Sequence, residues 1–216
     1  MTAITIDGPS GAGKSTIAKK LANRLGYEYL DTGAMYRYIT LYLINNKIDL
    51  TNKDLVCKLI QKNGTLKDEF KLLDSETNMD IRSKQVTRNV SLVSSYDCVR
   101  TFLVELQREI SDNTDIVLDG RDIGSVVLPN AEFKFYLTAS EQERARRRHL
   151  QYKDSSSDTY EEILKDIIRR DAYDMNREIS PLVIPKNATI IDSTDLTIKE
   201  TIDKMLGCIL GENNAI

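Results

Sequence analysis

The sequence predicts an α/β fold in which five parallel strands form one sheet with helices on both faces. Short apolar segments alternate with longer segments of helical periodicity, and this alternation is typical of a parallel sheet wrapped by helices. The first apolar segment runs into a glycine-rich turn, which is followed directly by a helical segment. With 216 residues, 41% of them hydrophobic and 29% charged, the chain suits one domain with insertions, or at most two small domains.

The predicted strands are short and rich in β-branched or aromatic residues, as strands covered on both faces tend to be. They are residues 3–6 (AITI), 27–30 (YEYL), 115–118 (DIVL), 133–137 (FKFYL) and 188–191 (ATII). Between and after them, six segments have the pattern of helices, and in the first of these Ile17, Leu21 and Leu25 recur at helical spacing. The predicted helices are residues 13–25, 33–44, 89–110, 141–151, 159–177 and 197–210.

Two segments interrupt this alternation. Residues 63–86 alternate polar and apolar side chains and contain turn-forming residues, which predicts a small antiparallel insertion. Residues 153–158 (KDSSSD) are polar and lie next to an arginine-rich helix, so we expect a mobile lid over about residues 147–160. The expected organisation is therefore a single domain over residues 1–216 with these two additions.

The turn GPSGAGKS has the spacing of a phosphate-binding loop: Gly8, four residues, then Gly13, Lys14 and Ser15. The glycines let the backbone curl so that successive N–H groups converge on phosphate oxygens, and the next helix points its positive end at the same anion. Lys14 adds a charge toward the β and γ phosphates, and the Ser15 hydroxyl can hold Mg²⁺. These features predict a P-loop NTPase fold of three α/β/α layers. The residues expected to bind the triphosphate are Gly8, Pro9, Ser10, Gly11, Ala12, Gly13, Lys14, Ser15 and Thr16.

A triphosphate site fits three classes of protein: a small-molecule kinase, a GTP-driven switch and a nucleic-acid-dependent ATPase. The switch is disfavoured because no glycine in the sequence follows an aspartate by three residues, so the Asp-x-x-Gly element is absent. Residues 46–49 (NKID) match a guanine-reading pattern, but they follow a helix near the N-terminus, whereas guanine-specificity loops follow a late strand. We interpret them as a helix end and a solvated turn.

The basic run at residues 144–149 (RARRRH) has three interpretations. It could bind nucleic acid, but the formal net charge is −3 and no aromatic residue for base stacking lies beside the arginines. It could be a solvated helix face. It could also serve a kinase lid, because Arg144, Arg147 and Arg148 share one helix face and could neutralise charge on a transferring phosphoryl group.

Charged residues gather where the second and third predicted strands end. Asp31 or Thr32 can cap the helix after the second strand, and Arg37 lies one turn further along. Residues 119–122 (DGRD) end the third strand, and because ligands bind at the carboxyl ends of strands in open α/β sheets, we expect them near the phosphate-binding loop. A third charged set shares one face of a predicted helix by i, i+4 and i+7 spacing: Arg170, Asp174 and Arg177.

The three cysteines, Cys57, Cys98 and Cys208, are isolated and have no metal-ligand spacing, so we expect reduced thiols in a cytoplasmic protein. No apolar run approaches the roughly 20 residues that cross a bilayer, and the first residues lack the features of a secretory signal. The expected partners therefore include no membrane, and the acidic balance of the chain argues against a nucleic-acid partner.

Five motifs, in this order, resemble those of the bacterial cytidylate kinases: IDGPSGAGKST, YLDTGAMYR, DGRDIGSVVLP, SEQERARRR and RDAYDMNREISPL. The resemblance covers about residues 3–194 and is weakest at the insertion, which matches in position and size more than in motif. The second and third motifs together favour this family over adenylate, shikimate or guanylate kinases. The resemblance implies a monomeric kinase of pyrimidine metabolism that transfers the γ-phosphoryl group of ATP to CMP or dCMP, with the insertion binding the monophosphate.

The resemblance also implies which residues bind the acceptor nucleotide. The CMP phosphate is held by Arg37, Arg121 and Arg177. Cytosine is read by Ser91, Arg100 and Asp122. The ribose is surrounded by Arg170 and Asp174, and Thr32 keeps a hydroxyl where some family members carry serine.

The chemistry of cytosine agrees with the base-reading residues. Cytosine offers an amino donor at N4 and acceptors at N3 and O2, which a carboxylate and a guanidinium complement. Uracil reverses N3 and replaces the N4 donor by an acceptor, so Asp122 would face a lone pair. Because an unpaired buried charge discriminates strongly, we predict that CMP and dCMP are used well ahead of UMP.

Phosphoryl transfer between nucleotides depends on positioning and charge neutralisation more than on covalent help. The residues predicted to act on the reacting phosphates are Lys14, Arg121, Arg177, Arg147 and Arg148. Mg²⁺ is expected on Ser15, with Asp119 placed to orient the water shell of the metal. Closure of the lid and the insertion would exclude water.

Overall fold

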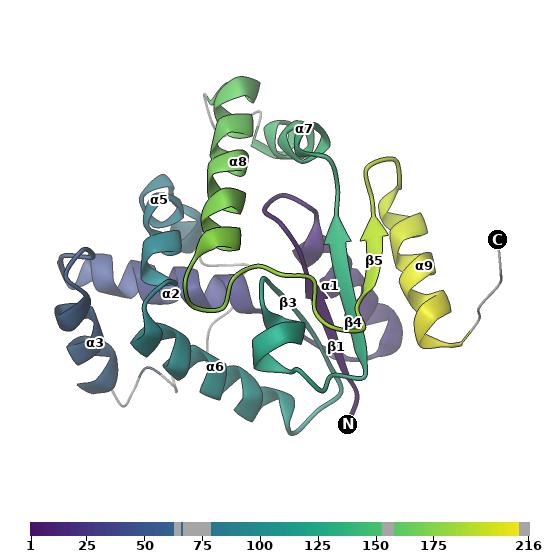
Figure 1. Cartoon of the computed structure of the whole chain (residues 1–216), viewed down its shortest axis with the longest axis horizontal. Coiled ribbons are helices and arrows are strands. Elements are labelled where there is room, and N and C mark those ends of the chain that lie inside the picture. Colours follow the sequence, from purple (N-terminus) through teal and green to yellow (C-terminus); the bar gives the residue numbers. More distant parts are fainter. Residues whose placement is uncertain (63–65, 67–78, 153–157, 212–216) are drawn as a thin grey trace. The chain divides into compact units, whose positions relative to one another are not determined.

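The computed structural model of the chain describes residues 1–62, 66, 79–152 and 158–211. Its strands form one sheet in the order β2-β3-β1-β4-β5, and the β1–β3, β1–β4 and β4–β5 pairs are parallel (Figure 1). The strands are β1 (Ala3–Asp7), β2 (Glu28–Asp31), β3 (Ile116–Gly120), β4 (Phe133–Thr138) and β5 (Thr189–Asp192). The predicted five-stranded parallel sheet with alternating helices is confirmed.

The inner strands are buried and the edge strands are not. All five residues of β3 and four of the five in β1 are buried, whereas Ile190 in β5 is 56% exposed and β2 is half-exposed. The expectation that every strand is buried is therefore wrong for β2 and β5, which are the two edge strands of the sheet.

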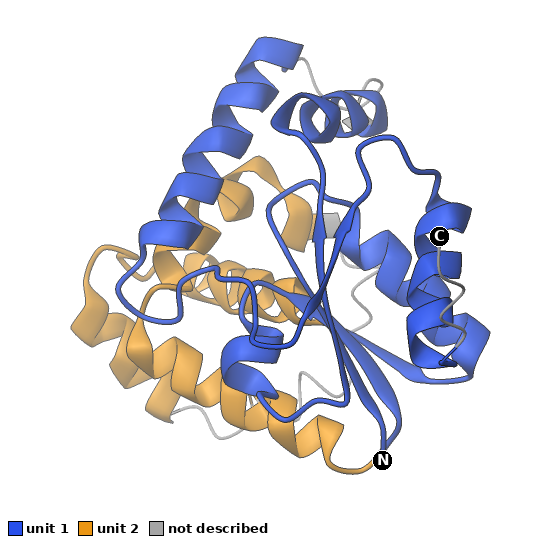
Figure 2. Ribbon diagram, turned by 45° about the vertical axis from the view of Figure 1, so that its right-hand side comes forward, with its two compact units in different colours: residues 1–30, 114–216 blue, residues 31–113 orange. Residues whose placement is uncertain are grey.

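The chain divides into two compact units, Met1–Leu30 with Thr114–Ile216 and Asp31–Asn113 (Figure 2). The first unit holds the strands and the helices α1 (Lys14–Leu25), η2 (Ile123–Val127), α7 (Glu141–Tyr152), α8 (Tyr160–Asn176) and α9 (Ile198–Ile209). Its main core lies where α1 and α9 pack together and α1 packs on β1 and β3, with Ile6, Leu21 and Phe135 fully buried. Among the described helices, none is long and apolar enough to cross a bilayer.

The second unit contains α2 (Thr32–Asn45), α3 (Lys53–Lys62), η1 (Met79–Arg82), α5 (Lys84–Val93) and α6 (Asp97–Ser111). Asp31 is the N-cap of α2, since its carboxylate accepts from Ala34 N at 2.8 Å. This observation decides between the two caps that the sequence left open. At the other end of α2, residues 46–49 form the predicted turn, with Lys47 N donating to Ile44 O.

The prediction of a single helix over residues 89–110 is wrong, because the helix is interrupted between the end of α5 and the start of α6. The hydroxyls of Ser94 and Ser95 donate to the carbonyls of Ser91 and Leu92 at the end of α5. Such side-chain hydrogen bonds compete with helix continuation, which gives a physical reason for the break. Helix α6 then begins after Tyr96.

The predicted insertion and lid are described only in part. Of the insertion, residues 63–65 and 67–78 lie outside the described residues, and residues 79–86 form η1 and the first turn of α5, where antiparallel strand was expected. Of the lid, residues 153–157 lie outside the described residues, and its two flanks are the end of α7 and the start of α8.

Cys57 and Cys98 form a disulfide that joins α3 to α6, with their Cα atoms 5.6 Å apart. The expectation of reduced thiols is therefore wrong for these two residues, and it holds for Cys208, which is free and exposed. The 41-residue separation of Cys57 and Cys98 gives no local signal, so only the packing of α3 on α6 brings the two sulfurs together.

We expect reduction of this disulfide to lower the free energy of unfolding. Closing a loop of 41 residues restricts the unfolded chain by about 3–4 kcal/mol in the chain-entropy estimate. Denaturant unfolding with and without a thiol reductant measures the loss, which Cys57→Ser should reproduce without reductant. Cys208→Ser is the matched control and should leave the reductant effect intact. Superimposable curves for oxidised and reduced protein would contradict the assignment.

Candidate active site

The glycine-rich turn lies between β1 and α1, as the sequence predicts. Gly8 has φ of +149°, and a Cβ at this position would lie 2.0 Å from the carbonyl oxygen of Leu137 in β4. No side chain fits there, so the loop depends on glycine at its first position. The Lys14 Nζ donates to Pro9 O at 2.8 Å, which folds the lysine back over its own loop.

Lys14 is a buried cation with other cations near it. Burial lowers the pKa of Lys14 most and Arg121 also lowers it, while Asp119, Asp7 and Asp171 oppose the change, and the resulting pKa is about 7. A polyanion placed against this lysine would favour its charged form. The loop therefore has the electrostatic character of a phosphate site.

Ser15 begins the second group of polar contacts, at the start of α1. Its Oγ donates to Asp119 Oδ2 at 2.9 Å, and the hydroxyl of Tyr29 donates to Asp119 Oδ1 at 2.8 Å. The structure thus joins the two residues that the sequence predicted around Mg²⁺. A hydroxyl and a carboxylate offer oxygen ligands only, which are the ligands that Mg²⁺ prefers, so the residues present fit the ion.

The segment with Arg121 and Asp122 follows β3, which is the strand next to β1. In the register of the two strands, Asp7 pairs with Gly120, so the phosphate-binding loop and residues 121–124 leave the sheet side by side. The two oxygens of Asp7 accept from Ile123 N at 2.8 Å and from Gly124 N at 2.7 Å. Asp7 therefore fixes the second segment against the end of β1.

Asp7 makes these contacts away from water. Burial raises the pKa of Asp7 most, and charge repulsion from Asp122 also raises it. The hydrogen bonds from Gly124 and Ile123 oppose part of this rise, and the resulting pKa is about 6. Sequence reasoning missed Asp7, because nothing in its neighbourhood shows that its partners are backbone groups of a segment more than a hundred residues away.

The structure pairs each of two predicted acceptor arginines with a predicted acceptor carboxylate. Arg121 Nε donates to Asp174 Oδ2 at 2.9 Å, and Arg177 Nη2 lies 3.3 Å from Asp122 Oδ1. Burial alone would lower the pKa of Arg121, but Asp174 and then Asp171 and Asp119 raise it above its ordinary value. These four residues form one cluster within the first unit.

Arg177 does not share a helix face with Arg170 and Asp174, contrary to the sequence prediction. Helix α8 ends at Asn176, and Arg177 is in extended backbone with φ −65° and ψ 142°. Its Nε donates to Ser180 O at 2.5 Å, and this bond fixes the segment that follows α8. The change of direction is what lets Arg177 reach Asp122.

Arg170 is a buried guanidinium whose Nε has no hydrogen-bond partner among the described residues. Burial lowers the pKa of Arg170 most, Arg148 and Arg121 also lower it, Asp174 and Asp166 oppose them, and the resulting pKa is about 10. The mutual effect places Arg148, Arg170 and Arg121 in one cationic neighbourhood. An anionic ligand would relieve their repulsion.

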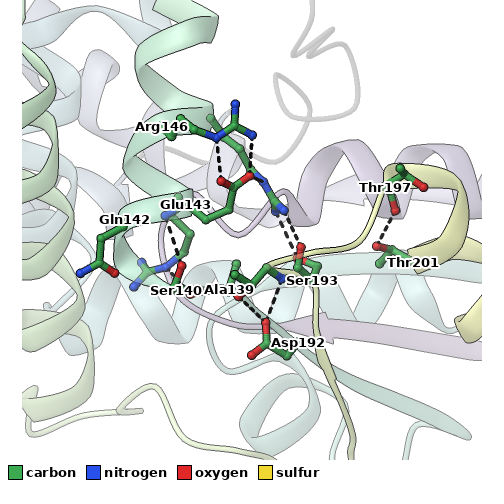
Figure 3. Close-up of polar contacts among 12 residues, drawn as sticks. Ala139, Ser140, Gln142, Glu143, Arg146, Asp192, Ser193, Thr197 and Thr201 are labelled. Atoms are coloured by element: carbon green, nitrogen blue, oxygen red, sulfur yellow. Dashed lines mark hydrogen bonds and ion pairs between the residues drawn. The ribbon is translucent and has the colours of Figure 1, made fainter.

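The other arginines of the basic run on α7 are engaged inside the protein. Arg144 is buried and donates to Ser10 O and Asp171, so it is not available to a transferring phosphoryl group. Arg147 donates to Glu143 and to Ser193 O, on the segment after β5. Arg146 also pairs with Glu143 on the same helix, as Figure 3 shows. Together these bonds lower the pKa of Glu143 to about 2, Arg146 having the largest effect.

The remaining predicted acceptor residues lie in the second unit. Arg37 Nη1 donates to Thr87 Oγ1 at 2.9 Å, and Thr32 is buried in the first turn of α2. Arg100 is buried, donates to Ser94 O at 3.3 Å and stacks its guanidinium 5.5 Å from the ring centre of Tyr36.

The break between α5 and α6 brings Ser91 and Arg100 together. On an unbroken helix, residues nine apart lie on opposite faces and about 13 Å apart along the axis. In the structure, Ser94 accepts from Arg100 through its carbonyl and donates to Ser91 O through its hydroxyl. The predicted base-reading residues of this unit are therefore linked through one serine that the sequence analysis did not single out.

Comparison with known proteins gives one consistent family. Residues 4–210 match the family model described as cytidylate kinase. A cytidylate kinase of Caldanaerobacter subterraneus subsp. tengcongensis is 47% identical over 209 residues, which cover 95% of this chain and 93% of the relative. A cytidylate kinase of Alkaliphilus oremlandii is 44% identical over 211 residues, covering 96% of this chain and 97% of the relative.

A solved structure of a gluconokinase from Sinorhizobium meliloti shares the fold. Its TM-score is 0.51 at 14% sequence identity, with 98% of this chain and 94% of that chain covered. At this identity the likeness concerns the fold alone.

We expect Gly8→Ala to be far more harmful than the same change at Gly26. The new Cβ would meet Leu137 O at 2.0 Å, so the variant should lose about 3 kcal/mol or more of folding free energy and most of its ATP binding. Gly26 has φ of +70° and nothing within 4 Å of a Cβ, so Gly26→Ala should cost about 1–2 kcal/mol and keep ATP binding. Denaturant unfolding and ATP titration measure both. Equal losses in the two variants would contradict the steric argument.

Proposed function

The chain belongs to the cytidylate kinase family, and from this premise we propose that it transfers the γ-phosphoryl group of ATP to CMP, and also to dCMP. The new bond joins a phosphate oxygen of CMP to the γ-phosphorus, and the bond between the γ-phosphorus and its bridging oxygen breaks to release ADP. The products are CDP, or dCDP, and ADP.

The observation that carries this proposal is the adjacency of two loops at one end of the sheet. The loop after β1 holds Lys14, and the segment after the neighbouring strand β3 holds Arg121 and Asp122. Arg121 is close enough to Lys14 to lower the pKa of the lysine. A donor phosphate on one loop and an acceptor phosphate on the other would lie near each other, as direct phosphoryl transfer requires.

We assign the acceptor nucleotide to the residues that the family resemblance implies. Arg37, Arg121 and Arg177 would hold the CMP phosphate, and the partly buried ion pair of Arg121 with Asp174 supports a fixed orientation for its guanidinium. Ser91, Arg100 and Asp122 would read cytosine. Arg170 and Asp174 would contact the ribose, and Thr32 would add its hydroxyl. The buried carboxylate of Asp122 supports discrimination against uracil.

We assign the donor side to residues 8–16 and to the cations around them. Lys14 would neutralise the β and γ phosphates, and Arg148, next to the buried Arg170, would add positive charge at the transferring group. Arg147 is assigned a weaker role, because it is already bound to Glu143 and Ser193. When bound, Mg²⁺ would be held by Ser15 with Asp119 beside it, and it would neutralise charge on the phosphates.

The expected location and assembly follow from the substrates and the family. Both nucleotides are metabolites of the cytoplasm, so we place the activity there, with the protein acting as a monomer. The disulfide between Cys57 and Cys98 is unusual for that compartment, where thiols are kept reduced.

An acceptor panel tests the function directly. Purified protein with ATP and Mg²⁺ is offered CMP, dCMP, UMP, AMP, shikimate, gluconate or no acceptor, and ADP is measured. We expect rapid ADP formation with CMP and dCMP, and slow formation with the others. Hydrolysis of GTP or ATP that is independent of the acceptor would overturn the proposal in favour of a switch or an ATPase.

Replacing Asp122 by Asn should narrow the preference for CMP over UMP. The amide can donate to uracil O4, so the ratio of kcat/KM values for the two acceptors should fall about tenfold or more, although both values fall with the loss of the Arg177 pair. Asp203→Asn, at an exposed aspartate paired with Arg24, is the control and should leave the ratio unchanged. An unaltered ratio in Asp122→Asn would remove Asp122 from base recognition.

A further inference from the structure

We propose that the buried pair of Arg144 and Asp171 positions the phosphate-binding loop for ATP. The pair does so by hydrogen-bonding to both the N–H and the carbonyl of Ser10. This inference deepens the proposed kinase function, because it assigns a positioning role on the donor side. It concerns Arg144, which the sequence placed among the phosphoryl-facing arginines, and Asp171, which no motif reasoning singled out. Neither residue would touch the reacting phosphates in this role.

The contacts form a closed triangle on one residue of the loop. Ser10 N donates to Asp171 Oδ1 at 2.9 Å, and Arg144 Nη1 donates to Ser10 O at 2.7 Å. The third side is the ion pair itself, with Arg144 Nη1 2.5 Å from Asp171 Oδ2. The side chains of Arg144 and Asp171 are only 5% and 7% exposed, so the triangle is closed to water.

The pair connects the loop to both helices that flank the predicted lid. Arg144 lies in the first turn of α7, and its Nε also donates to the carbonyl of Ala139, the residue that follows β4. Figure 1 shows α7 beyond the arrowhead of β4. Asp171 lies in α8, which packs on α7 through Ala145, Ile163 and Ile167. The position of Ser10 is therefore set by α7, α8 and β4 together.

The next residue of the loop, Gly11, is fixed by close packing. A Cβ on Gly11 would lie 3.3 Å from Arg144 Cβ and 3.5 Å from Ile167 Cδ1, so the loop packs directly on both helices. Gly11 also has φ of +79°, which strains any other residue. Two consecutive loop residues, Ser10 and Gly11, thus contact the same two helices.

The chemistry of the pair indicates positioning. A buried ion pair often adds little net stability over apolar side chains of similar size, because both charges are removed from water. What apolar side chains cannot do is accept from one backbone N–H and donate to the carbonyl of the same residue. The pair thereby directs the Ser10 peptide, and with it the amides that follow in the loop, toward one orientation.

The deciding experiment compares two variants at this pair with a matched carboxylate elsewhere. Arg144→Met with Asp171→Leu removes both charges at once and keeps the volume, so the protein should fold. Asp171→Asn is the single change, and Asp7→Asn is its control, since Asp7 is equally buried and also accepts backbone N–H groups, but from residues 123 and 124. ATP affinity is measured by titration without any acceptor, and CMP affinity is measured separately.

We expect ATP to bind about tenfold more weakly, or worse, in both variants at the pair, with CMP affinity changed by less than about threefold. Asp7→Asn should show the reverse preference, weakening CMP more than ATP. Unchanged ATP affinity in the folded double variant would overturn the proposal, as would equal losses for ATP and CMP. If neither variant at the pair folds, the pair is required for folding itself, and the positioning proposal is also overturned.

This measurement is independent of the acceptor. Loss of ATP affinity in a protein that transfers phosphate to no tested nucleotide would support the positioning role and contradict the proposed function. Normal transfer to CMP with unaltered ATP affinity in the double variant would support the proposed function and contradict the positioning role.

Discussion

The arrangement of the loops that follow β1 and β3 depends on buried carboxylates that hold positive and polar groups in place. Asp7 accepts hydrogen bonds from the backbone that follows Asp122. Asp171, paired with Arg144, accepts one from the phosphate-binding loop. Asp174 forms an ion pair with Arg121. Each is buried, and each contacts a segment far away in the sequence. Without them, the loops after β1 and β3 would lose the bonds that fix their orientation. The carboxylates therefore set the geometry of the two loops.

The buried carboxylates also offset the electrostatic repulsion among the clustered cations. A kinase of two anionic substrates needs several cations directed at one small region, and those cations repel one another. The repulsion is visible where Arg121 lowers the pKa of Lys14 and where Arg148 lowers the pKa of Arg170. Fixed internal carboxylates make such a cluster tolerable in the folded protein, and bound phosphates would complete the neutralisation. Preorganised cations of this kind need little rearrangement when charge moves during transfer.

Much of the fold could be predicted from the sequence, because its signals are local. Strand, glycine-rich turn and helix follow one another within residues 3–25, and the phosphate-binding loop was predicted from that order. What could not be predicted depends on contacts between distant segments. The break at residues 94–96 has no glycine or proline to mark it, and Ser94 and Ser95 act through their hydroxyls. The Cys57–Cys98 disulfide and the partners of Asp7 and Asp171 required the folded chain. The roles assigned to individual acceptor residues stay predictions.

The central claim is that a donor and an acceptor nucleotide are held end to end, with their phosphates between the two loops. Binding of one molecule that carries adenosine and cytidine at opposite ends of a polyphosphate chain tests it most directly. If the sites are aligned, this molecule should bind at least about a hundredfold more tightly than ATP, because the second contact is made at no further loss of freedom, and it should exclude both ATP and CMP. Binding no tighter than ATP alone, with CMP still able to bind, would contradict the account.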